Sequence, residues 1–455
     1  MADSSVLVVG GGLAGITTAL RCADAGRGVT LVEGRPRLGG AAFSFRRGDL
    51  TIDNGQHVFL RCCEAYQWFV DRVGARDKTT LQPRLDIPVL RADGRSARLR
   101  RTACVLAPAH LSAALARYGL LSPLDRARAV RGAIALKLLD PTDPRLDART
   151  LGDYLRAHGQ PPAVIDALWG IVAVATLNID PDEASLALAA KVFRTGLLDR
   201  ADAADVGYAA APLGDLHSVA ARRALDAAGV EVLLGHRVES VTPGGGDAVL
   251  RHRDERVTRR AEAVVLAVPP REAFTVLPEL ADTAAGSARE LGTSPIVNVH
   301  VVFDRRVTDL PFAAGVDSPV QWIFDRTDTS GLTSVRPGAQ YLAITISSAD
   351  AIIDTPSAAL TERFVAELRR LLPAARQAEV VDTFVTRERH ATFRQAAGTA
   401  RLRPGPVSAL DGVWLAGAWT ATGWPDTMES AVRSGIAAAD SVLRVAERDA
   451  MRFAS

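Results

Sequence analysis

Three glycines near the N-terminus have the spacing and surroundings of a phosphate-binding turn. Gly10, Gly12 and Gly15 form a G-x-G-x-x-G pattern that follows an apolar, strand-like run and opens a segment with helical spacing. Gly10 permits a tight turn, Gly12 lets a pyrophosphate approach the backbone, and Gly15 lets helix and strand pack closely. The N–H groups of Leu13 and Ala14 at the helix start favour the same anion. The pattern predicts a dinucleotide-binding turn, and a purely structural turn is the alternative.

An acidic residue follows at the distance that such a turn requires. Glu33 lies 18 residues after Gly15, at the end of a second apolar run, residues 29–32. A carboxylate at this position accepts hydrogen bonds from the adenosine ribose, and it would repel a 2′-phosphate, which disfavours NADP. The alternative is a solvated strand end. The two features together favour the ribose-binding role.

The next segment carries an arginine and a pair of glycines at a further fixed spacing. Glu33, Arg37, Gly39 and Gly40 form an E-x-x-x-R-x-G-G pattern. An arginine can neutralise phosphate charge, and two glycines let the backbone come close to a pyrophosphate and a flavin. With this extension the chain resembles the superfamily of flavin-containing amine oxidases and phytoene desaturases. The resemblance implies that the dinucleotide is FAD, and an exposed loop is the alternative.

The second part of the resemblance lies near the C-terminus, where a strand, a loop and a helix close the flavin site in this superfamily. The resemblance assigns further cofactor contacts to Gly417, Ala418, Trp424, Pro425 and Met428, and to Val238 in an earlier strand. The helix is expected to begin after Pro425 with Asp426 or Thr427 as its cap, and its positive end would face the flavin N1 and C2 carbonyl. Ala418 is a departure, because many relatives carry Asp or Glu there to bind a ribityl hydroxyl. No Cys or His occupies a familiar flavin-attachment position, so we expect non-covalent FAD.

Residues 53–63 carry the pattern that narrows the resemblance. They read Asp-Asn-Gly-Gln-His, then an apolar run and two cysteines, as in the squalene-associated branch of the superfamily, the hydroxysqualene dehydroxylases. The resemblance covers essentially the whole chain and places Gly55, Gln56 and His57 in the flavin pocket. His57 and Asp53 are the candidate catalytic residues, as proton donor or substrate contact. Their alternatives are shaping of the pocket and ordinary turn chemistry.

The resemblance implies a reductive reaction on a C30 isoprenoid. Reduced FAD would donate a hydride to hydroxysqualene as the hydroxyl leaves, giving squalene, a step of squalene and hopanoid biosynthesis. A general acid would help hydroxide leave as water, and a long apolar tunnel would hold the substrate. No second glycine motif lies between a strand and a helix, so we expect an external electron donor. The alternatives are a carotenoid-type desaturase or amine oxidase that removes hydride from its substrate, and a flavin-binding scaffold without catalysis.

These segments can meet only if the chain folds as an α/β protein with a discontinuous, Rossmann-like FAD-binding domain. Alternating strand and helix signals predict the three parts of this domain in residues 1–79, 205–288 and 386–455. Residues 80–204 show leucine, alanine and arginine at helical spacing and few strand signals, which predicts a helical insert of a substrate domain. Residues 289–385 predict the mixed sheet of that substrate domain.

The composition limits the classes of partner. The chain has 455 residues, of which 48% are hydrophobic and 23% charged, as in an ordinary globular protein with a core. Lys and Arg number 54 against 52 Asp and Glu without same-sign blocks, which excludes nucleic acid as an expected partner. The four cysteines, at positions 22, 62, 63 and 104, lack metal-ligand spacing. We therefore expect no metal, and free thiols in a reducing cytoplasm.

The sequence predicts no signal peptide and no membrane span. The longest uncharged run, residues 102–116, is shorter than the roughly 20 apolar residues that cross a bilayer, and it contains a proline and a histidine. Peripheral contact with the inner face of the membrane stays open. Residues 106–121 have two interpretations, a solvated helix of a bundle or an amphipathic patch that faces a membrane.

Overall fold

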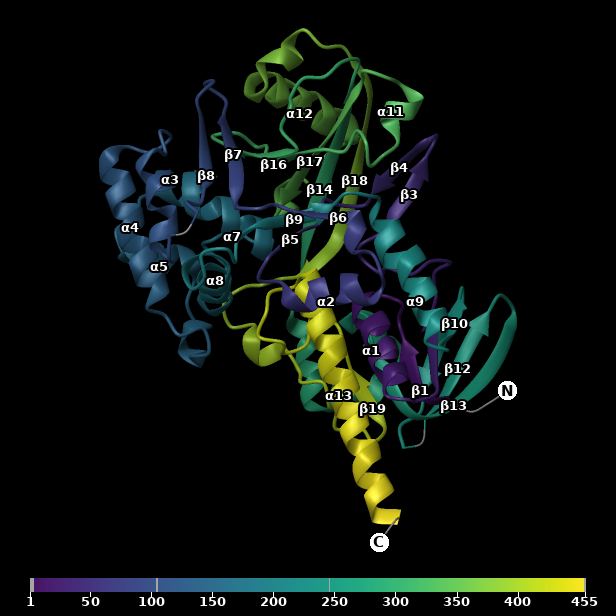
Figure 1. The fold of residues 1–455 in the computed structure, drawn as a ribbon. Coiled ribbons are helices and arrows are strands. Elements are labelled where there is room, and N and C mark those ends of the chain that lie inside the picture. The colour runs from purple at the N-terminus through teal and green to yellow at the C-terminus, as the bar shows by residue number, and fades with distance from the viewer. Residues whose placement is uncertain (1–3, 104, 245, 454–455) are drawn as a thin grey trace.

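The computed structural model describes residues 4–103, 105–244 and 246–453 (Figure 1). Its first sheet has the order β10-β2-β1-β13-β12-β11, and β19 pairs with β13. Parallel pairing joins β1 (Ser4–Val9), β2 (Val29–Glu33), β10 (Glu231–Leu234), β19 (Val413–Leu415) and the second half of β13 (Glu255–Leu266). β11 (Arg237–Val241) and β12 (Asp247–His252) form an antiparallel extension on the first half of β13. The predicted βαβ unit is confirmed.

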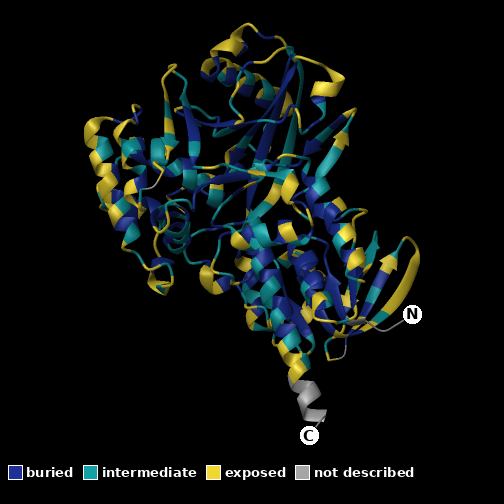
Figure 2. Cartoon of the chain, in the orientation of Figure 1, coloured by how far each residue is buried: buried dark blue, intermediate teal, exposed yellow. Residues whose placement is uncertain are grey.

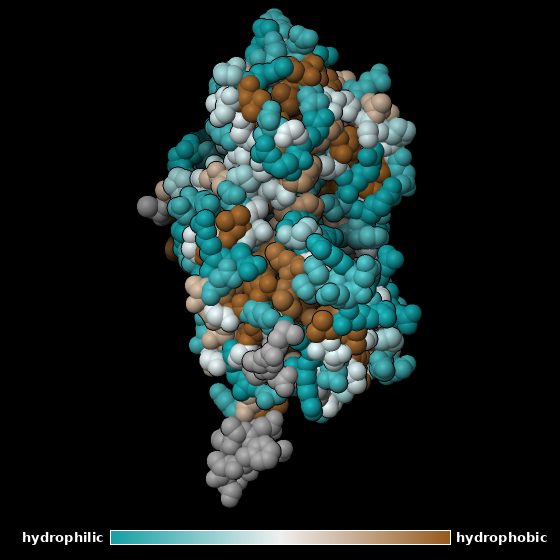
Figure 3. Space-filling model, turned by 90° about the vertical axis from the view of Figure 1, so that its right-hand side faces the viewer, coloured by the Kyte–Doolittle hydropathy of each residue, from teal (hydrophilic) through white to brown (hydrophobic). Residues whose placement is uncertain are grey.

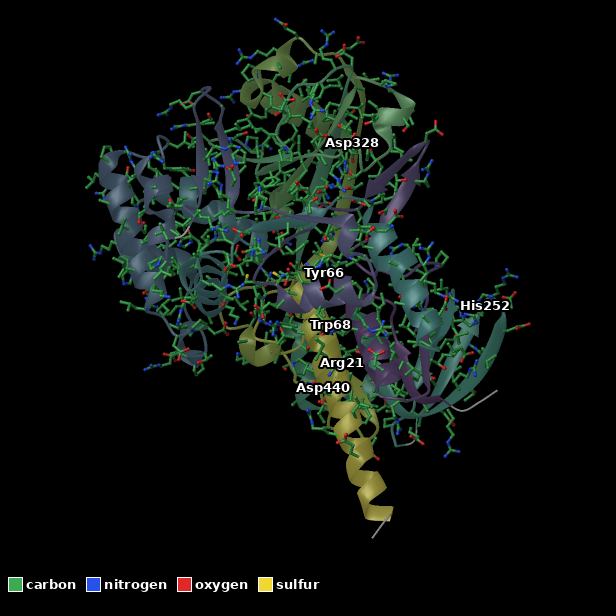
Figure 4. All side chains as sticks on the ribbon, viewed as in Figure 1. Arg21, Tyr66, Trp68, His252, Asp328 and Asp440 are labelled. Atoms are coloured by element: carbon green, nitrogen blue, oxygen red, sulfur yellow. The ribbon has the colours of Figure 1, made fainter. Side chains whose placement is uncertain are left out.

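Helices from the two ends of the chain pack together beside this sheet. α1 (Leu13–Asp24) lies against α13 (Met428–Phe453), and a Cβ on Gly435 would stand 2.3 Å from the Ala14 carbonyl oxygen. Thr18 Oγ1 donates to both the Ala14 and Gly435 carbonyls. Arg21 on α1 pairs with Asp440 on α13 at 2.7 Å (Figure 4). The glycine allows a close helix crossing, so that the first and last parts of the chain form one unit.

The second sheet has the order β18-β14-β17-β16-β15-β7-β8. Its strands are β14 (Thr293–Phe303), β15 (Phe312–Val316), β16 (Trp322–Asp325), β17 (Gln340–Ser347), β18 (Val380–Phe393), β7 (Asp86–Arg91) and β8 (Ser96–Arg100). α12 (Ser357–Leu371) packs Leu360, Phe364 and Leu368 against one face of it. Mixed pairing is confirmed, because β15 and β7 are parallel and the other strand pairs are antiparallel.

The region expected to be a helical insert differs from the prediction at its start. β7 and β8 fall within residues 80–204 and yet complete the second sheet, and β6 (Thr79–Leu81) joins a small sheet with β5 (Val58–Leu60) and β9 (Val206–Ala209). Local periodicity did not reveal these strands, because β7 and β6 are joined to their sheets by β15 and β9, which lie more than a hundred residues away, and β8 pairs with β7. Helices follow, chiefly α4 (Pro123–Lys137), α5 (Leu151–Ala157), α7 (Gly170–Leu177) and α8 (Leu186–Phe193).

Two further local predictions can be compared with the structure. Residues 106–121 contain only two short helical pieces, Ala109–Leu111 and α3 (Ser112–Ala116), instead of one long helix. Cys22, Cys62 and Cys63 are free thiols as expected, and Cys104 lies outside the described residues. Near the start of residues 205–288, a π-helical turn, Asp215–Ala220, continues into α9 (Ala221–Ala227).

Burial follows the two sheets and the helices packed on them (Figure 2). Figure 3 looks onto the side where β10 and β12 lie, and it shows hydrophilic side chains over most of that face with apolar ones gathered near its middle. Within the described residues, no helix is both long and apolar enough to cross a bilayer, and no cluster of His, Cys, Asp and Glu could hold a metal ion.

Candidate active site

The glycine turn after β1 has a geometry that other residues could not adopt. Gly10 has a φ of +111°, and a Cβ on Gly15 would lie only 1.9 Å from the Gly10 carbonyl oxygen. Gly12 is the N-cap of α1 and offers no side chain to its first turn. The N–H groups at the start of α1, including those of Leu13 and Ala14, therefore need an external acceptor, and a pyrophosphate supplies one.

The second glycine pair meets the first turn backbone to backbone. Gly39 N donates to the Gly11 carbonyl at 2.9 Å. Gly39 and Gly40 have φ values of +99° and +56°, and a Cβ on Gly40 would lie 2.8 Å from Gly12 Cα. Because glycines have no side chain, this pair leaves the backbone at the start of α1 uncovered. Such a backbone surface suits the close approach of a diphosphate.

Glu33 is already oriented by backbone donors beside the glycine turn. Gly11 N donates to one carboxylate oxygen at 2.7 Å, and Arg35 N donates to the other at 2.8 Å. Each oxygen keeps a lone pair for a ribose hydroxyl. Val238 is buried in β11, which starts just after His236, whose N–H donates to the Glu33 carbonyl at 3.1 Å. Cofactor contacts of Glu33 and Val238 stay predictions.

Arg37 makes intramolecular contacts at the position where we expected a phosphate ligand. Its Nη1 donates to the carbonyls of Leu38 and Gly40 at 3.3 and 3.2 Å. The guanidinium carbon lies 3.5 Å from the centroid of the Phe43 ring, and burial lowers the pKa of Arg37. These contacts fix the Gly39–Gly40 turn, so the structure shows a positioning role, and a phosphate contact stays a prediction.

A buried arginine that sequence reasoning missed holds the C-terminal loop. Gly417 has a φ of +137°, and its N–H donates to Ser434 Oγ on α13 at 2.8 Å. Arg403 Nη2 donates to the carbonyls of Ala418 and Thr420 at 2.9 and 2.6 Å. Desolvation lowers the pKa of Arg403 to about 10. The loop thus keeps its shape although Ala418 replaces the acidic residue of many relatives, and no local sequence signal marked Arg403.

The start of α13 agrees with one of the two expected caps. Thr427 Oγ1 accepts from Ser430 N at 3.3 Å, whereas Asp426 accepts from Phe393 N at 2.8 Å. Met428 is the first helical residue and Pro425 is buried just before it. The Trp424 ring lies 4.8 Å from both the Lys191 ammonium and the Arg433 guanidinium. Contacts of these residues with a flavin stay predictions.

Asp53 and Asn54 join the two domains. The buried Asp53 carboxylate accepts from Arg326 Nη2 at 2.5 Å, from Ser44 Oγ at 2.6 Å and from Leu213 N at 2.9 Å. Both of its oxygens are therefore occupied by partners within the protein. This arrangement favours a positioning role for Asp53 over direct chemistry.

Asn54 makes the complementary set of contacts. Its Oδ1 accepts from Phe43 N, and its Nδ2 donates to the Ala41 carbonyl and to Glu388 on β18. Asn298 on β14 donates to the Asn54 carbonyl at 3.1 Å. The loop that follows the glycine pair is thus tied directly to the second sheet.

Gln56 and His57 line a cavity of about 290 Å³ at this junction. Its apolar wall comes from Tyr208, Phe312 and Phe324, and its polar rim includes Arg326 and Asp328 (Figure 4). The buried Gln56 Nε2 and His57 Nε2 have no hydrogen-bond partner within the described residues. Desolvation lowers the pKa of His57, so the imidazole is neutral at pH 7. Two buried nitrogens without partners indicate a place for a ligand.

His217 is a second residue that sequence reasoning missed, and it lies beneath the glycine loop. Its Nδ1 must donate to the Ala42 carbonyl at 3.1 Å, so its Nε2 accepts from the Tyr66 hydroxyl at 2.8 Å (Figure 4). Burial lowers the pKa of His217 to about 4. A lone histidine in a helical segment gave no signal of this role, because both partners are distant in sequence.

The described residues fit FAD. A helix N-terminus without a side-chain cap suits the pyrophosphate, the oriented Glu33 carboxylate suits the ribose, and the buried Gln56 and His57 nitrogens have no partner among the described residues. The fold and the site define a flavin-dependent oxidoreductase. The sequence profile described as flavin containing amine oxidoreductase matches residues 13–443, and the chain belongs to this family.

Curated relatives align along nearly the whole chain. The chain is 31% identical over 447 residues to a hydroxysqualene dehydroxylase from Rhodopseudomonas palustris, covering 97% of this chain and 99% of that protein. It is 29% identical to the hydroxysqualene dehydroxylase from Sinorhizobium fredii, with 96% and 98% covered. A zeta-carotene desaturase from Synechocystis is 25% identical, with 96% and 97% covered.

Solved structures share the fold. Cyclohexylamine oxidase from Brevibacterium oxydans gives a TM-score of 0.70 at 18% identity, covering 98% of this chain and 100% of that chain. An oxidoreductase from Methanosarcina mazei gives a TM-score of 0.73 at 14% identity, with 96% and 99% covered. The predicted α/β fold, with a Rossmann-like FAD-binding domain and a substrate domain, is confirmed.

We predict that Gly40→Ala weakens FAD binding by about tenfold or more, because the added Cβ meets Gly12 Cα beside the diphosphate position. Gly48→Ala is a matched control, since Gly48 has nearly the same φ, +58°, but nothing within 4 Å of its Cβ. Titration of apo-protein with FAD, followed by flavin fluorescence, measures both. Equal affinities in the two variants would contradict the predicted contact.

Because His217 is neutral in the folded protein, we predict that the protein loses stability in acid. Its pKa is lower in the folded protein, about 4, than the ordinary 6.5, so its contribution is complete above pH 6.5 and is lost as the pH falls toward 4. The full contribution is on the order of 3 kcal/mol. Urea unfolding at several pH values should show a smaller pH dependence for His217→Gln than for the wild type. Exposed His390→Gln is the control, and equal slopes for the wild type and His217→Gln would refute the assignment.

Proposed function

We propose that this enzyme reduces hydroxysqualene to squalene with FAD that is bound non-covalently. The relatives named hydroxysqualene dehydroxylase support the substrate. The observation that carries the proposal is the cavity that His57 lines together with the aromatic side chains of Tyr208, Phe312 and Phe324. Bound reduced FAD would supply the hydride, and the chain's own residues would bind the isoprenoid and assist loss of its hydroxyl.

The aromatic wall suits a substrate that becomes cationic. Phe312 is near both Tyr208 and Phe324, with ring centroids 5.9 and 6.2 Å apart. As the hydroxyl leaves, positive charge develops on the allylic carbon, and the negative faces of aromatic rings stabilise such charge. An apolar wall also binds the hydrocarbon chain and excludes water that would recapture the cation.

His57 is the proposed partner of the leaving hydroxyl. Its buried Nε2 has no partner among the described residues, and the lowered pKa keeps the imidazole neutral at pH 7. A neutral imidazole can donate one hydrogen bond to the departing oxygen and so stabilise the developing hydroxide, which takes up a proton from solvent to become water. Asp53, with both oxygens occupied, is proposed to hold Arg326 at the rim and to leave the chemistry to His57.

The electrons are proposed to come from an external donor. The second sheet of the described chain is mixed and carries no glycine turn of the dinucleotide-binding type between a strand and a helix. The alternative function is oxidation of a carotenoid precursor or an amine on the same scaffold. The similarity to a zeta-carotene desaturase and the fold shared with an amine oxidase support this alternative.

An anaerobic single turnover tests the proposed function. The holoenzyme is photoreduced, mixed with hydroxysqualene, and followed by visible flavin absorbance while the extract is analysed for squalene. We expect one squalene per flavin reoxidised. If the flavin stays reduced and no squalene forms, the proposal fails, and the oxidised enzyme should then reduce its flavin with a polyene or an amine.

The same assay isolates the contribution of His57. We expect His57→Phe to slow flavin reoxidation by about a hundredfold, as is typical for loss of one hydrogen-bond donor to a developing negative charge. His57→Gln keeps a donor and should be affected less, and unchanged flavin spectra in both variants would show that the cofactor is still bound. Equal rates for wild type and His57→Phe would remove His57 from the proposed mechanism.

A further inference from the structure

α4 is apolar on both its inner and its outer face. Ala129, Gly132 and Leu136 face the helical region and are buried. On the outside, Leu124, Val130, Ile134 and Leu138 are 60%, 48%, 55% and 79% exposed. A surface helix is normally polar on its outer side, so the outer apolar residues indicate a surface that another molecule covers.

The outer residues form one stripe with basic residues along its edges. At about 100° per residue, Val130 and Leu138 lie one turn either side of Ile134, and Leu124 lies near one edge of the same face. Arg126 and Lys137 fall on one side of the stripe, and Arg128 and Arg131 fall on the other.

α4 carries one acidic residue against its four basic ones. Asp125 in the first turn pairs with Arg128 at 2.9 Å, and Lys137 reaches Asp199 at 2.5 Å. Four basic residues and one acidic residue give α4 a formal charge of +3, of which one charge is offset by Asp199. Positive charge beside an apolar stripe is complementary to a surface that is apolar inside and negative at its boundary.

The loop next to α4 and the position of α4 in the fold support the same kind of surface as partner. Leu106, 85% exposed, lies in the uncharged loop just before α3, and α3 contacts α4. The other exposed large apolar residues of the described chain are scattered, among them Val335 and Val407. α4 forms the outer edge of the helical region, away from the α1–α13 unit (Figures 1 and 2).

We propose that the outer face of α4 docks on an anionic lipid bilayer, with Leu124, Val130, Ile134 and Leu138 below the headgroups and the flanking arginines at phosphate level. Arginine stems can lie along apolar surface while their guanidinium groups reach the phosphates. This attachment would need no spanning helix. It does not depend on the identity of the isoprenoid, although a bilayer is where such a substrate dissolves.

Vesicle sedimentation of the holoenzyme tests the docking surface. We expect binding to vesicles of phosphatidylcholine with phosphatidylglycerol, and weak binding to phosphatidylcholine alone. Ile134→Ser with Leu138→Ser should weaken binding by about tenfold or more. Arg128→Gln with Arg131→Gln should weaken it less and reduce its salt dependence.

The control is Val335→Ser with Val407→Ser, which removes two exposed apolar side chains elsewhere and should leave binding unchanged. Flavin content and circular dichroism establish that every variant is folded. The proposal is overturned if the wild type binds neither vesicle or if the control loses binding as much as the α4 variant. A dimer in sedimentation velocity that the α4 variant dissociates would instead assign this face to a second copy of the chain. No substrate is used, so failure here is distinct from failure of the proposed function.

Discussion

The structure depends on one buried contact between its two domains, the ion pair of Asp53 with Arg326. Both side chains are buried, so each charge needs the other, and removal of one leaves an uncompensated charge in the interior. Asp53 follows the nucleotide-binding turn and Arg326 follows β16 of the second sheet. Asn54 adds hydrogen bonds to Ala41 and to Glu388. Together these contacts determine how the loop after the Gly39–Gly40 pair lies relative to the second sheet and the cavity beside it.

The remaining parts of the site are held by similar long-range polar contacts. Arg403 donates to carbonyls of the 417–422 loop, and His217 Nδ1 donates to the Ala42 carbonyl. Glu429, in the first turn of α13, accepts from Ala65 N and Tyr66 N at the start of α2 (Glu64–Arg72). At the His217 contact, Gly39 lets the segments come close, since a Cβ on Gly39 would lie 3.3 Å from His217 Cβ. Glycines therefore provide the space in this site, and buried polar side chains provide the orientation.

The difference between local glycine geometry and long-range polar contacts also explains which features the sequence could predict. The glycine turn, Glu33 and the βαβ unit were predictable, because their pattern is local and its geometry follows from backbone sterics. The cap at Thr427 was predictable for the same reason. β7 and β8 were not, because strands are stabilised by partners that pattern alone does not identify, and this hairpin joins the second sheet only through the pairing of β7 with the distant β15. Arg326, Arg403 and His217 were missed because a lone arginine or histidine acquires its role only from distant contacts. Arg37 donates to neighbouring carbonyls, a positioning contact that the pattern did not indicate, and its phosphate contact stays a prediction.

The most direct test of the account is a double-mutant cycle with Asp53→Asn and Arg326→Met, read out as the free energy of unfolding and as the dissociation constant for FAD. If the ion pair is the junction that orients both sheets, each single variant should cost about 3–5 kcal/mol of stability and weaken FAD binding. The double variant should cost at least about 2 kcal/mol less than the sum of the two, because it removes both charges together. Additive losses, or single variants that retain wild-type FAD affinity, would contradict the claim that this contact governs the site.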